Sequence, residues 1–563
     1  MTVPTLLRWG ALCCFACVAM PAQTASAQAV PHLEKRGAST QLVVDGKPFL
    51  ALSGEWGNTT ATTMENLKPL WDEAQQLHLN TITPALYWSQ LEPVEGQFDF
   101  SLVDGMIQEA RRHNLRIAFV WFGSWKNSTS SYAPGWVKTD SKRFPRAMIS
   151  GGRPHETFSI FGEATREADA KAFRALMSHI RQVEGGQHTV IMMQVNNEVG
   201  FRGDARDHCP LADEAFAKAV PKELMDYLQK NKEVLMPELR SAWSAAGYKM
   251  TGNWEEVFGK GEYTDEIFMA WYYARYNDRV AAAGKAEIPL PMWVNVWLIR
   301  PDYRPGQYPS GGAVPKVHDI WKAGAPNIDM LSPDNGATGN HKYWWNLFTY
   351  PRNPFFVPET TGGAMGAASV YYAVGHLNAI GYEPFGIERD RPGGPLGRSY
   401  DIISQMAPVI LEARTKGQGW VDGVWFDELT RELQVDLGDY RLEVTPAASG
   451  GRNPGPAPAA GGGRMSEPAP AAQAAAPDPA GIFVAVAPDE FYLAGSGMSV
   501  NFVPRTPGPP NTGFTTYEDG KFVDGRWVRG LQLAAGDDIF RKALATLGGR
   551  QAARIVHVKI YRF

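Results

Sequence analysis

Two glutamates at the ends of apolar segments have the clearest potential for chemistry. Glu198 follows the apolar run 191–195 and a pair of asparagines, and Glu359 ends the segment FFVPE. An apolar run that stops at amide and carboxylate groups is typical of a buried strand whose C-terminal end opens onto a polar site. If both strands end at one site, the two carboxyl groups could cleave a glycosidic bond, one as proton donor and one as nucleophile.

A helix N-terminus is the alternative location for either glutamate, because the helix dipole favours a carboxylate there. The surrounding elements decide between the two. Between about residues 40 and 385, apolar segments of strand length alternate with segments of helical periodicity. The helical segments are 64–77, 102–110 and 173–183. The strand segments are 49–54, 80–88, 116–123, 188–195, 290–297, 327–334, 354–359 and 378–385.

Eight strands separated by helices predict an α/β fold, a (β/α)8 TIM barrel, over residues 30–415. An open nucleotide-binding sheet is disfavoured because no glycine-rich phosphate motif follows the early strands. Glu198 then lies at the C-terminal end of strand four and Glu359 at that of strand seven. Barrel enzymes carry their catalytic groups at this end, so the barrel interpretation favours the chemical role for both glutamates.

Residues 416–563 predict a β-sandwich-like C-terminal domain. Alternating segments occur at 431–444, 481–495, 525–533 and 553–563, and Gly438-Asp439 and Asp519-Gly520 are turn signals. An Ala/Pro/Gly-rich insertion at about 447–480 has almost nothing to bury and is expected to be disordered.

Residues 1–29 combine Arg8, a short apolar stretch and small residues suited to cleavage, which indicates an export signal. We therefore expect a periplasmic or extracellular protein. No later segment reaches the roughly 18 apolar residues that a membrane span needs. Three of the four cysteines lie in the signal and only Cys209 remains, so a disulfide framework is excluded in the mature monomer.

Composition narrows the classes of partner. A net charge of −4 and a pI near 6.3 give no basic surplus for phosphate contacts, so nucleic acid is not an expected partner. The 18 Trp and 20 Tyr suit stacking on apolar ligand faces as well as core packing. The histidines show no spacing suited to a metal, and we expect neither a metal nor a cofactor. The sequence does not indicate an oligomeric state.

Three motifs carry a resemblance to a known family. The segments QVNNEVG (194–200), YWSQLEPVEGQFDFS (87–101) and SGE (53–55) resemble those of the glycoside hydrolase family 35 β-galactosidases, within the retaining barrel glycosidase clan. The resemblance covers most of residues 40–390, and the β-rich tail is similar to that of a bacterial subgroup. It implies a retaining exo-β-galactosidase with a carbohydrate substrate. Glu198 would be the acid/base, Glu359 the nucleophile, and Asn197 a donor to the sugar 2-hydroxyl.

Departures from the family pattern leave the sugar specificity open. Asn196 stands where that family usually has glutamate, and Gly123-Ser124 replaces the Ala-Glu that binds the galactose ring. Alternatives are another retaining β-glycosidase of the clan, such as an arabinosidase, glucosidase or mannosidase, or a non-catalytic carbohydrate-binding protein. The mechanism predicts a raised pKa for Glu198 and a lowered pKa for Glu359. Retention predicts carboxyl groups about 5–5.5 Å apart, and inversion about 6.5–9.5 Å.

Further substrate-binding candidates lie near predicted strand ends, although each has a structural alternative as a core or ion-pair residue. Tyr87 is a candidate for a sugar hydroxyl contact, and Trp125 and Trp297 for stacking. The remaining candidates are Asn196, Asn295, Asp334 and Glu383. Glu55 also ends a predicted strand, and Glu92 is expected to hold a loop.

Overall fold

The computed structural model describes residues 1, 29–297, 299–300, 302–334, 341–350, 353–427, 430–447, 477–533, 544–547 and 553–563. Residues 2–28 of the expected export signal and 448–476 of the Ala/Pro/Gly-rich insertion lie outside this range, so the structure does not test either prediction.

A closed parallel barrel forms the larger part of the chain, which confirms the predicted fold class. The sheet order is β4-β14-β13-β12-β11-β10-β7-β5, with β6 also pairing with β7. Main-chain hydrogen bonds close the ring, from Asn80 N to Leu52 O and from Thr83 N to Gly54 O, both 3.0 Å. The strands are β4 (Ala51–Leu52), β5 (Thr81–Ile82), β6 (Ala85–Tyr87), β7 (Arg116–Lys126), β10 (Val190–Asn197), β11 (Met292–Trp297), β12 (Met330–Asp334), β13 (Val357–Thr360) and β14 (Gly381–Pro384). Each predicted strand segment overlaps one of them, or two in the case of 80–88.

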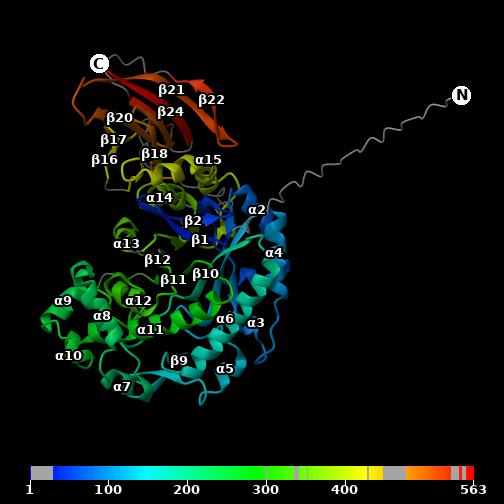
Figure 1. Ribbon diagram of the computed structural model, residues 1–563, viewed down its shortest axis with the longest axis vertical. Helices are drawn as coiled ribbons and strands as arrows, with labels where there is room; N and C mark the ends of the chain where they lie inside the picture. The colour runs from blue at the N-terminus through cyan, green and yellow to red at the C-terminus, as the bar shows by residue number, and fades with distance from the viewer. Residues whose placement is uncertain are drawn as a thin grey trace, which may run out of the picture.

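Helices surround the barrel (Figure 1). In α4, the buried residues Val103, Met106, Ile107 and Ala110 form one stripe that packs on the sheet. The periodic segment 64–77 is split in two, with Lys68 and Pro69 between the helices. The helices are α1 (Met64–Leu67), α2 (Leu70–Gln76), α3 (Trp88–Leu91), α4 (Ser101–Arg112), α6 (Glu163–Glu184), α11 (Glu262–Lys285), α12 (His318–Gly324), α13 (His341–Phe348), α14 (Gly363–Gly375) and α15 (Pro395–Thr415). Short 3₁₀ helices are η1 (Thr60–Thr62), η2 (Lys232–Val234), η3 (Pro315–Val317) and η4 (Ile387–Arg389).

A three-stranded antiparallel sheet closes the N-terminal end of the barrel. It consists of β1 (His32–Arg36), β2 (Ser39–Val44) and β3 (Lys47–Phe49). Leu42 and Val44 pack into the interior core with residues such as Met192 and Trp293. Asp45 pairs with Arg116 at 2.6 Å and with His188 at 2.9 Å, near the starts of two strands. With this end sealed, only the opposite end can receive a ligand.

Two excursions extend the barrel at the end away from the C-terminal domain (Figure 1). The one after β7 contains α5 (Gly135–Thr139) and the hairpin β8 (Arg146–Ile149) and β9 (Arg153–Phe158). The one after β10 contains α7 (Pro210–Ala217), α8 (Lys222–Lys230), α9 (Pro237–Ala245) and α10 (Trp254–Phe258). Sequence periodicity did not predict these elements.

The C-terminal domain is a two-sheet sandwich around its own apolar core, as predicted. One sheet has the order β15-β18-β19-β24-β21-β22 and the other β16-β17-β20-β23. The strands are β15 (Val421–Trp425), β16 (Leu433–Leu437), β17 (Tyr440–Pro446), β18 (Ala480–Ala487), β19 (Glu490–Ser496), β20 (Met498–Pro504), β21 (Thr512–Val523), β22 (Arg526–Gln532), β23 (Leu544–Leu547) and β24 (Arg554–Arg562).

One predicted turn in this domain is confirmed and one is wrong. Gly438-Asp439 connects β16 and β17. Asp519-Gly520 lies inside β21, and the chain reverses instead at Asp524-Gly525, where both residues have positive φ as a tight hairpin requires. A turn dipeptide inside a strand is tolerated here because Gly520 lies against the Trp527 ring on β22.

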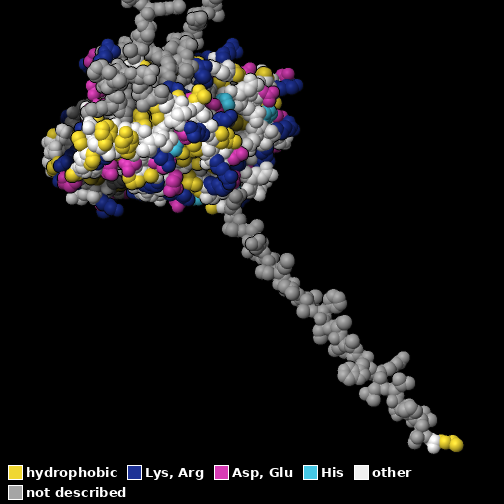
Figure 2. All heavy atoms as spheres, turned by 90° about the horizontal axis from the view of Figure 1, so that it is seen from above, with side chains coloured by type: hydrophobic (Ala, Val, Ile, Leu, Met, Phe, Trp, Pro, Cys, Tyr) yellow, Lys and Arg dark blue, Asp and Glu magenta, His cyan; other side chains and the backbone are white. Residues whose placement is uncertain are grey.

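On the face seen in Figure 2, Lys and Arg side chains are interspersed with Asp and Glu and do not gather into one basic patch. In the part of the chain that the structure describes, no helix combines the length and apolar character required to cross a bilayer.

Candidate active site

The open end of the barrel gathers carboxyl groups from several strands. Asp334 ends β12 and lies directly beside Glu359 of β13 in the strand register. Glu198 follows β10 immediately, Glu383 lies in β14, and Glu55 bridges to Thr83 just beyond β4. The predicted strand ends therefore bring together the two glutamates singled out from the sequence, and they add three further acids.

Glu198 and Glu359 face one another at short range. One carboxylate oxygen of each, and one of Asp334, lie within 4.8 Å of one another. This distance agrees with the separation of about 5–5.5 Å in retaining glycosidases and is shorter than the roughly 6.5–9.5 Å of inverting ones. Among the described residues, these three acids are also the group whose spacing would admit a metal ion. No other observation points to a metal.

Local backbone strain presents Glu198 to this space. Asn196 and Glu198 both have positive φ, 57° and 44°, and the pairing with β7 shifts register between Val195 and Asn197. Non-glycine residues adopt this conformation at a cost of order 1–3 kcal/mol, and such strain concentrates at functional sites. The irregular end of β10 turns Asn196 toward the helices and leaves Glu198 at the mouth.

Asn295 fixes two of the acids at once. Its Oδ1 accepts a hydrogen bond from the Glu198 main-chain N–H at 2.9 Å, and its Nδ2 donates to Asp334 Oδ2 at 2.6 Å. Both Asn295 and Asp334 are buried. These two predicted substrate-binding residues are therefore engaged with each other in this structure, and they position the acid/base candidate.

Lys126 supplies a buried positive charge that the sequence interpretation missed. Its Nζ donates to Asn197 Oδ1 at 3.0 Å, and it is only 5% exposed. Strand β7 runs to residue 126, three residues beyond its predicted end, and so reaches the mouth. The basic residue just after an apolar segment was the available signal. Because Asn197 Oδ1 accepts this hydrogen bond from Lys126, the side-chain amide is oriented by it, and Nδ2 can donate to a ligand.

Burial raises the pKa of every acid in the cluster, and repulsion from neighbouring carboxylates adds to the rise for all of them except Glu198. Burial raises the pKa of Glu198, while Lys126, a hydrogen bond with Asp334 and Arg202 oppose the rise. Burial and then the Glu198 charge raise the pKa of Glu359 to about 7, against the lowering effect of Lys126. The expectation of a raised pKa for Glu198 is met. The expectation of a lowered pKa for Glu359 is wrong, because one lysine does not balance the burial and the neighbouring acid.

Burial favours the protonated form of the other three acids as well. Burial, followed by the charge of Glu359, raises the pKa of Asp334 and of Glu55 well above their usual ranges. Burial also raises that of Glu383, although hydrogen bonds from Thr83 and Ser53 oppose it. Thr83 Oγ1 donates to Glu383 Oε2 at 2.8 Å. Neutral carboxyl groups at a mouth can both donate and accept, which suits sugar hydroxyls.

Several predicted site residues do not reach the mouth. Trp125 is fully buried, with its ring 4.4 Å from that of Tyr276 and 5.3 Å from that of Tyr273 on α11. The Asn196 side chain accepts from the Trp125 main-chain N–H at 3.1 Å and donates to Asn277 Oδ1 at 3.0 Å. Both are held in the layer between the barrel and its helices, because an irregular strand end does not keep the simple alternation of faces.

The Gly123-Ser124 departure has a packing explanation. A Cβ on Gly123 would lie 2.4 Å from Trp121 Nε1 and 2.6 Å from Asp169 Oδ1. The Ser124 hydroxyl is 2.7 Å from that of Tyr276, and its N–H donates to Asp169 at 3.1 Å. This pair therefore packs against α6 and α11 and does not face a ligand.

Two aromatic candidates lie closer to the opening. Tyr87 is 9% exposed, and its hydroxyl donates to the Asn58 main-chain carbonyl, so this structure gives the hydroxyl a protein partner. Trp297 is half-buried, lies beside Asp334 in the register, and carries the Arg202 guanidinium 4.7 Å from its ring centroid. Trp297 remains a candidate for stacking on a sugar. As expected, Glu92 holds its loop, accepting from Trp88 Nε1 and Gly96 N.

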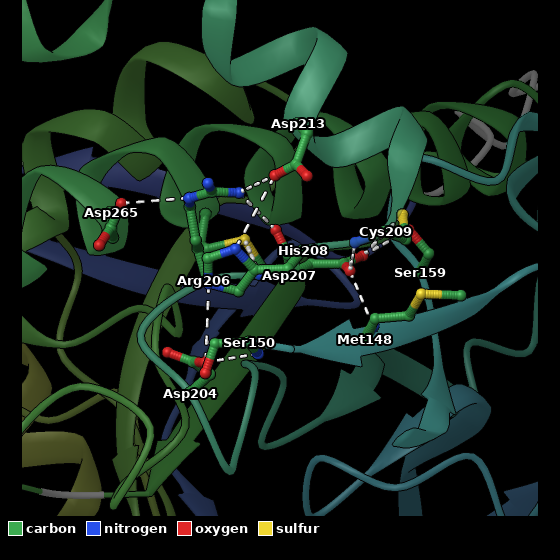
Figure 3. A network of polar contacts seen from close by, with 11 residues as sticks. Met148, Ser150, Ser159, Asp204, Arg206, Asp207, His208, Cys209, Asp213 and Asp265 are labelled. Carbon is green, nitrogen blue, oxygen red and sulfur yellow. Dashed lines mark hydrogen bonds and ion pairs between the residues drawn. The ribbon is translucent and has the colours of Figure 1, made fainter. Parts of the chain in front are cut away.

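A buried polar network anchors the loop that follows Glu198 (Figure 3). The Asp207 carboxylate accepts from the main-chain N–H groups of Met148 and Cys209 at 2.9 and 2.8 Å, and from Ser159 Oγ at 2.6 Å. Arg206 pairs with Asp213 at 2.6 Å. The loop is thereby tied to the β8–β9 hairpin and to α7, which holds the chain beyond Glu198 in place.

Replacing Asp207 by alanine is expected to destabilise the barrel by about 3 kcal/mol, because three buried donors lose their acceptor. Asp213→Ala is the matched control. Its carboxylate is half-exposed, so its loss should cost less than about 1 kcal/mol. Urea unfolding followed by tryptophan fluorescence measures both. Equal losses for the two variants would contradict the anchoring role.

Comparison with known proteins bears on the segment that contains Glu198. Residues 63–259 match the family model of glycoside hydrolase family 42, described as β-galactosidase. This segment resembles a glycoside hydrolase. The match includes Asn197 and Glu198 but not Glu359. It agrees with the retaining barrel clan inferred from the motifs, and it favours family 42 over family 35. Residues 396–543 match a domain of unknown function, DUF5597.

Two curated relatives are both named β-galactosidases. The chain is 30% identical over 203 residues to that of Xanthomonas manihotis, covering 35% of this chain and 31% of the relative. It is 25% identical over 193 residues to β-galactosidase GalA of Bacillus licheniformis, covering 32% and 24%. The matches thus span about a third or less of these relatives' lengths.

Solved structures are similar at a lower level. The β-galactosidase of Bacillus circulans sp. alkalophilus has a TM-score of 0.44 at 14% identity, over 65% of this chain and 57% of that one. The β-mannanase of the blue mussel Mytilus edulis has a TM-score of 0.40 at 14% identity, over 66% and 96%.

Proposed function

We propose that the protein is a retaining exo-β-galactosidase that removes terminal β-galactosyl residues from oligo- or polysaccharides by double displacement. The observation that carries the proposal is the placement of Glu198 and Glu359, whose carboxylate oxygens lie within 4.8 Å at the one end of the barrel left unsealed by the N-terminal sheet. Glu359 also lines a cavity of about 350 Å³. Glu198 is not among the residues that line this cavity, so the proposal depends on the carboxylate geometry and not on the cavity volume.

In the first step, Glu359 attacks the anomeric carbon while Glu198 donates its proton to the departing glycosidic oxygen. The bond from carbon to the leaving oxygen breaks as the bond to the Glu359 oxygen forms. Burial raises the pKa of Glu198, which favours the protonated form that donates to the leaving oxygen. Asn197, held by Lys126, is placed to donate to the 2-hydroxyl, a contact that strengthens as positive charge develops on the ring.

In the second step, water replaces the Glu359 ester oxygen at the anomeric carbon, and Glu198 accepts the proton of that water. Esterification removes the Glu359 charge, and that charge is one of the causes that raise the pKa of Asp334, Glu55 and Glu383. The repulsion that contributes to the raised pKa values of these three acids is therefore removed when the intermediate forms. Two displacements at one carbon return the original β-configuration.

Galactose as the substrate sugar is supported by the family 42 match and by the names of the curated relatives. A non-catalytic binding role is disfavoured, because ligand binding alone does not require two carboxyl groups at this separation across one site. Other retaining β-glycosidases share the same pair, so the choice among sugars depends on assay.

The test is hydrolysis of a panel of nitrophenyl β-glycosides, with the product anomer followed by NMR. We expect the galactoside to give the highest kcat/KM and the β-anomer to form first. Faster cleavage of the arabinoside, glucoside or mannoside would contradict the sugar, whereas initial release of the α-anomer would contradict the mechanism.

Lys126→Met is expected to move the acidic limb of the kcat/KM profile to higher pH. The nucleophile must be ionised to attack. The pKa of Glu359 is about 7 with Lys126 present, and the lysine charge lowers it. Removing the lysine charge therefore raises that pKa, by about one unit or more, and lowers activity about tenfold at pH values below the limb. Lys126→Arg keeps the charge and serves as the control. An unchanged limb in Lys126→Met would contradict this role.

A further inference from the structure

A cavity lies away from the barrel mouth, between the barrel helices and the C-terminal domain. Its volume is about 730 Å³. In Figure 1, α14 and α15 separate the barrel from the sandwich, and the cavity is lined by residues at the C-terminal ends of both helices, including His376 and Arg414. The other wall comes from the first strands of the C-terminal domain, including Asp422, Asp436 and Arg441.

Arg414 is a buried cation without a carboxylate partner among the described residues. It is 2% exposed, and its Nη2 donates to the Val374 carbonyl at 2.5 Å. Its Nε and Nη1 meet no hydrogen-bond acceptor in the described structure. Burial lowers the pKa of Arg414 to about 9, which still leaves it charged at neutral pH. A charged group buried without a counterion is costly, so the site favours an anion.

The rest of the lining holds two arginines and two aspartates, so the net positive charge of the cavity comes from Arg414. Arg441 and Arg505 share a single carboxylate, that of Asp436, at 2.8 and 3.1 Å. Asp422 is bonded to His376 at 2.8 Å and so is already engaged. In all, three arginines and two aspartates line the cavity. Planar guanidinium groups match the oxygens of phosphate and carboxylate in a bidentate manner.

We propose that this interdomain cavity binds a small oxyanion, with Arg414 as its central contact and Arg441 and Arg505 at its rim. The ligand class is a phosphate or a carboxylate, such as that of an acidic sugar. The site is independent of the barrel mouth, since it shares no lining residue with the carboxyl cluster. An anion bound there would contact both the barrel and the C-terminal domain and stabilise their junction.

The experiment measures the melting temperature of the full chain in phosphate, in citrate and in chloride at equal ionic strength, with binding constants from calorimetry. Ligand binding to the folded state raises the melting temperature. Arg414→Gln removes the central charge. Arg505→Gln removes a half-exposed rim charge that should not compromise folding. Arg143→Gln removes an equally exposed arginine paired with Glu95 elsewhere and is the matched control.

We expect phosphate or citrate to raise the melting temperature of the wild type above that in chloride. The rise should disappear in Arg414→Gln and shrink in Arg505→Gln, with binding weakened about tenfold or more, while Arg143→Gln behaves as wild type. A larger rise in phosphate would indicate a phosphate ligand, and a larger rise in citrate would indicate a carboxylate ligand. The proposal would be overturned if neither phosphate nor citrate raised the wild-type melting temperature above that in chloride. It would also be overturned if both cavity variants kept the wild-type rise. If Arg414→Gln does not fold, Arg505→Gln decides.

Discussion

Glu359→Ala is expected to lower kcat/KM for a nitrophenyl β-galactoside by about 10⁴-fold or more, equivalent to roughly 5.5 kcal/mol of transition-state stabilisation. The nucleophile bears the bond to carbon in the intermediate, and in the described structure Asp334 is its direct neighbour in the strand register. In the variant, burial still raises the pKa of Asp334 and so disfavours the ionised form that attack on carbon requires. Steady-state kinetics of the purified variant measure the loss.

Two controls separate lost chemistry from lost structure. Glu214→Ala, on the exposed face of α7 and paired only with Lys218, should retain wild-type activity. Azide added to Glu359→Ala can enter the space of the missing carboxylate and attack the anomeric carbon once, giving an α-galactosyl azide. An azide product of β-configuration, or activity within tenfold of wild type, would show that Glu359 is not the nucleophile.

Glu198→Ala is expected to lose more activity on substrates whose leaving group needs a proton to depart than on substrates with an activated leaving group. A phenyl or sugar leaving group needs the proton from Glu198, so its release should slow by about 10²–10⁴-fold. A dinitrophenyl group departs without a proton, so its first step should be nearly normal and the intermediate should accumulate as a burst. Measuring kcat/KM across a series of aryl galactosides gives the dependence.

The pH profile provides a second readout for the same variant. The basic limb reflects loss of the Glu198 proton, and burial raises the pKa of this group, so the limb lies above the usual range of a glutamate. Without the carboxyl group the basic limb should vanish, and azide should accelerate turnover by replacing water. A loss that is equal for all leaving groups, with the basic limb intact, would assign the acid/base role to another group.

Sequence patterning predicted the parts of this fold that depend on local apolar periodicity. All eight predicted strand segments overlap strands of the barrel, because a buried parallel strand is apolar along its length and ends at the site. The same logic placed Glu198 and Glu359 together, although they are remote in the chain. The sandwich followed from alternation in segments such as 431–444.

Other features depend on tertiary context that one sequence does not show. The sheet that seals the barrel is recognisable only once Leu42 and Val44 are seen in the interior. Lys126 and Trp125 are neighbours in β7 and so point to opposite faces of the strand, and the irregular pairing with β10 decides which of them reaches the mouth. The pKa of Glu359 depends on how many acids share the site, and strand prediction alone does not give that number.

Trapping the covalent intermediate tests the central claim most directly. A 2-deoxy-2-fluoro-β-galactoside with an activated leaving group slows both steps, but the second more, so the glycosyl-enzyme accumulates and its peptide can be identified by mass spectrometry. The arrangement of Glu198 and Glu359 predicts one fluorosugar attached to the peptide that contains Glu359. Attachment at another residue, or hydrolysis without any covalent adduct, would contradict it.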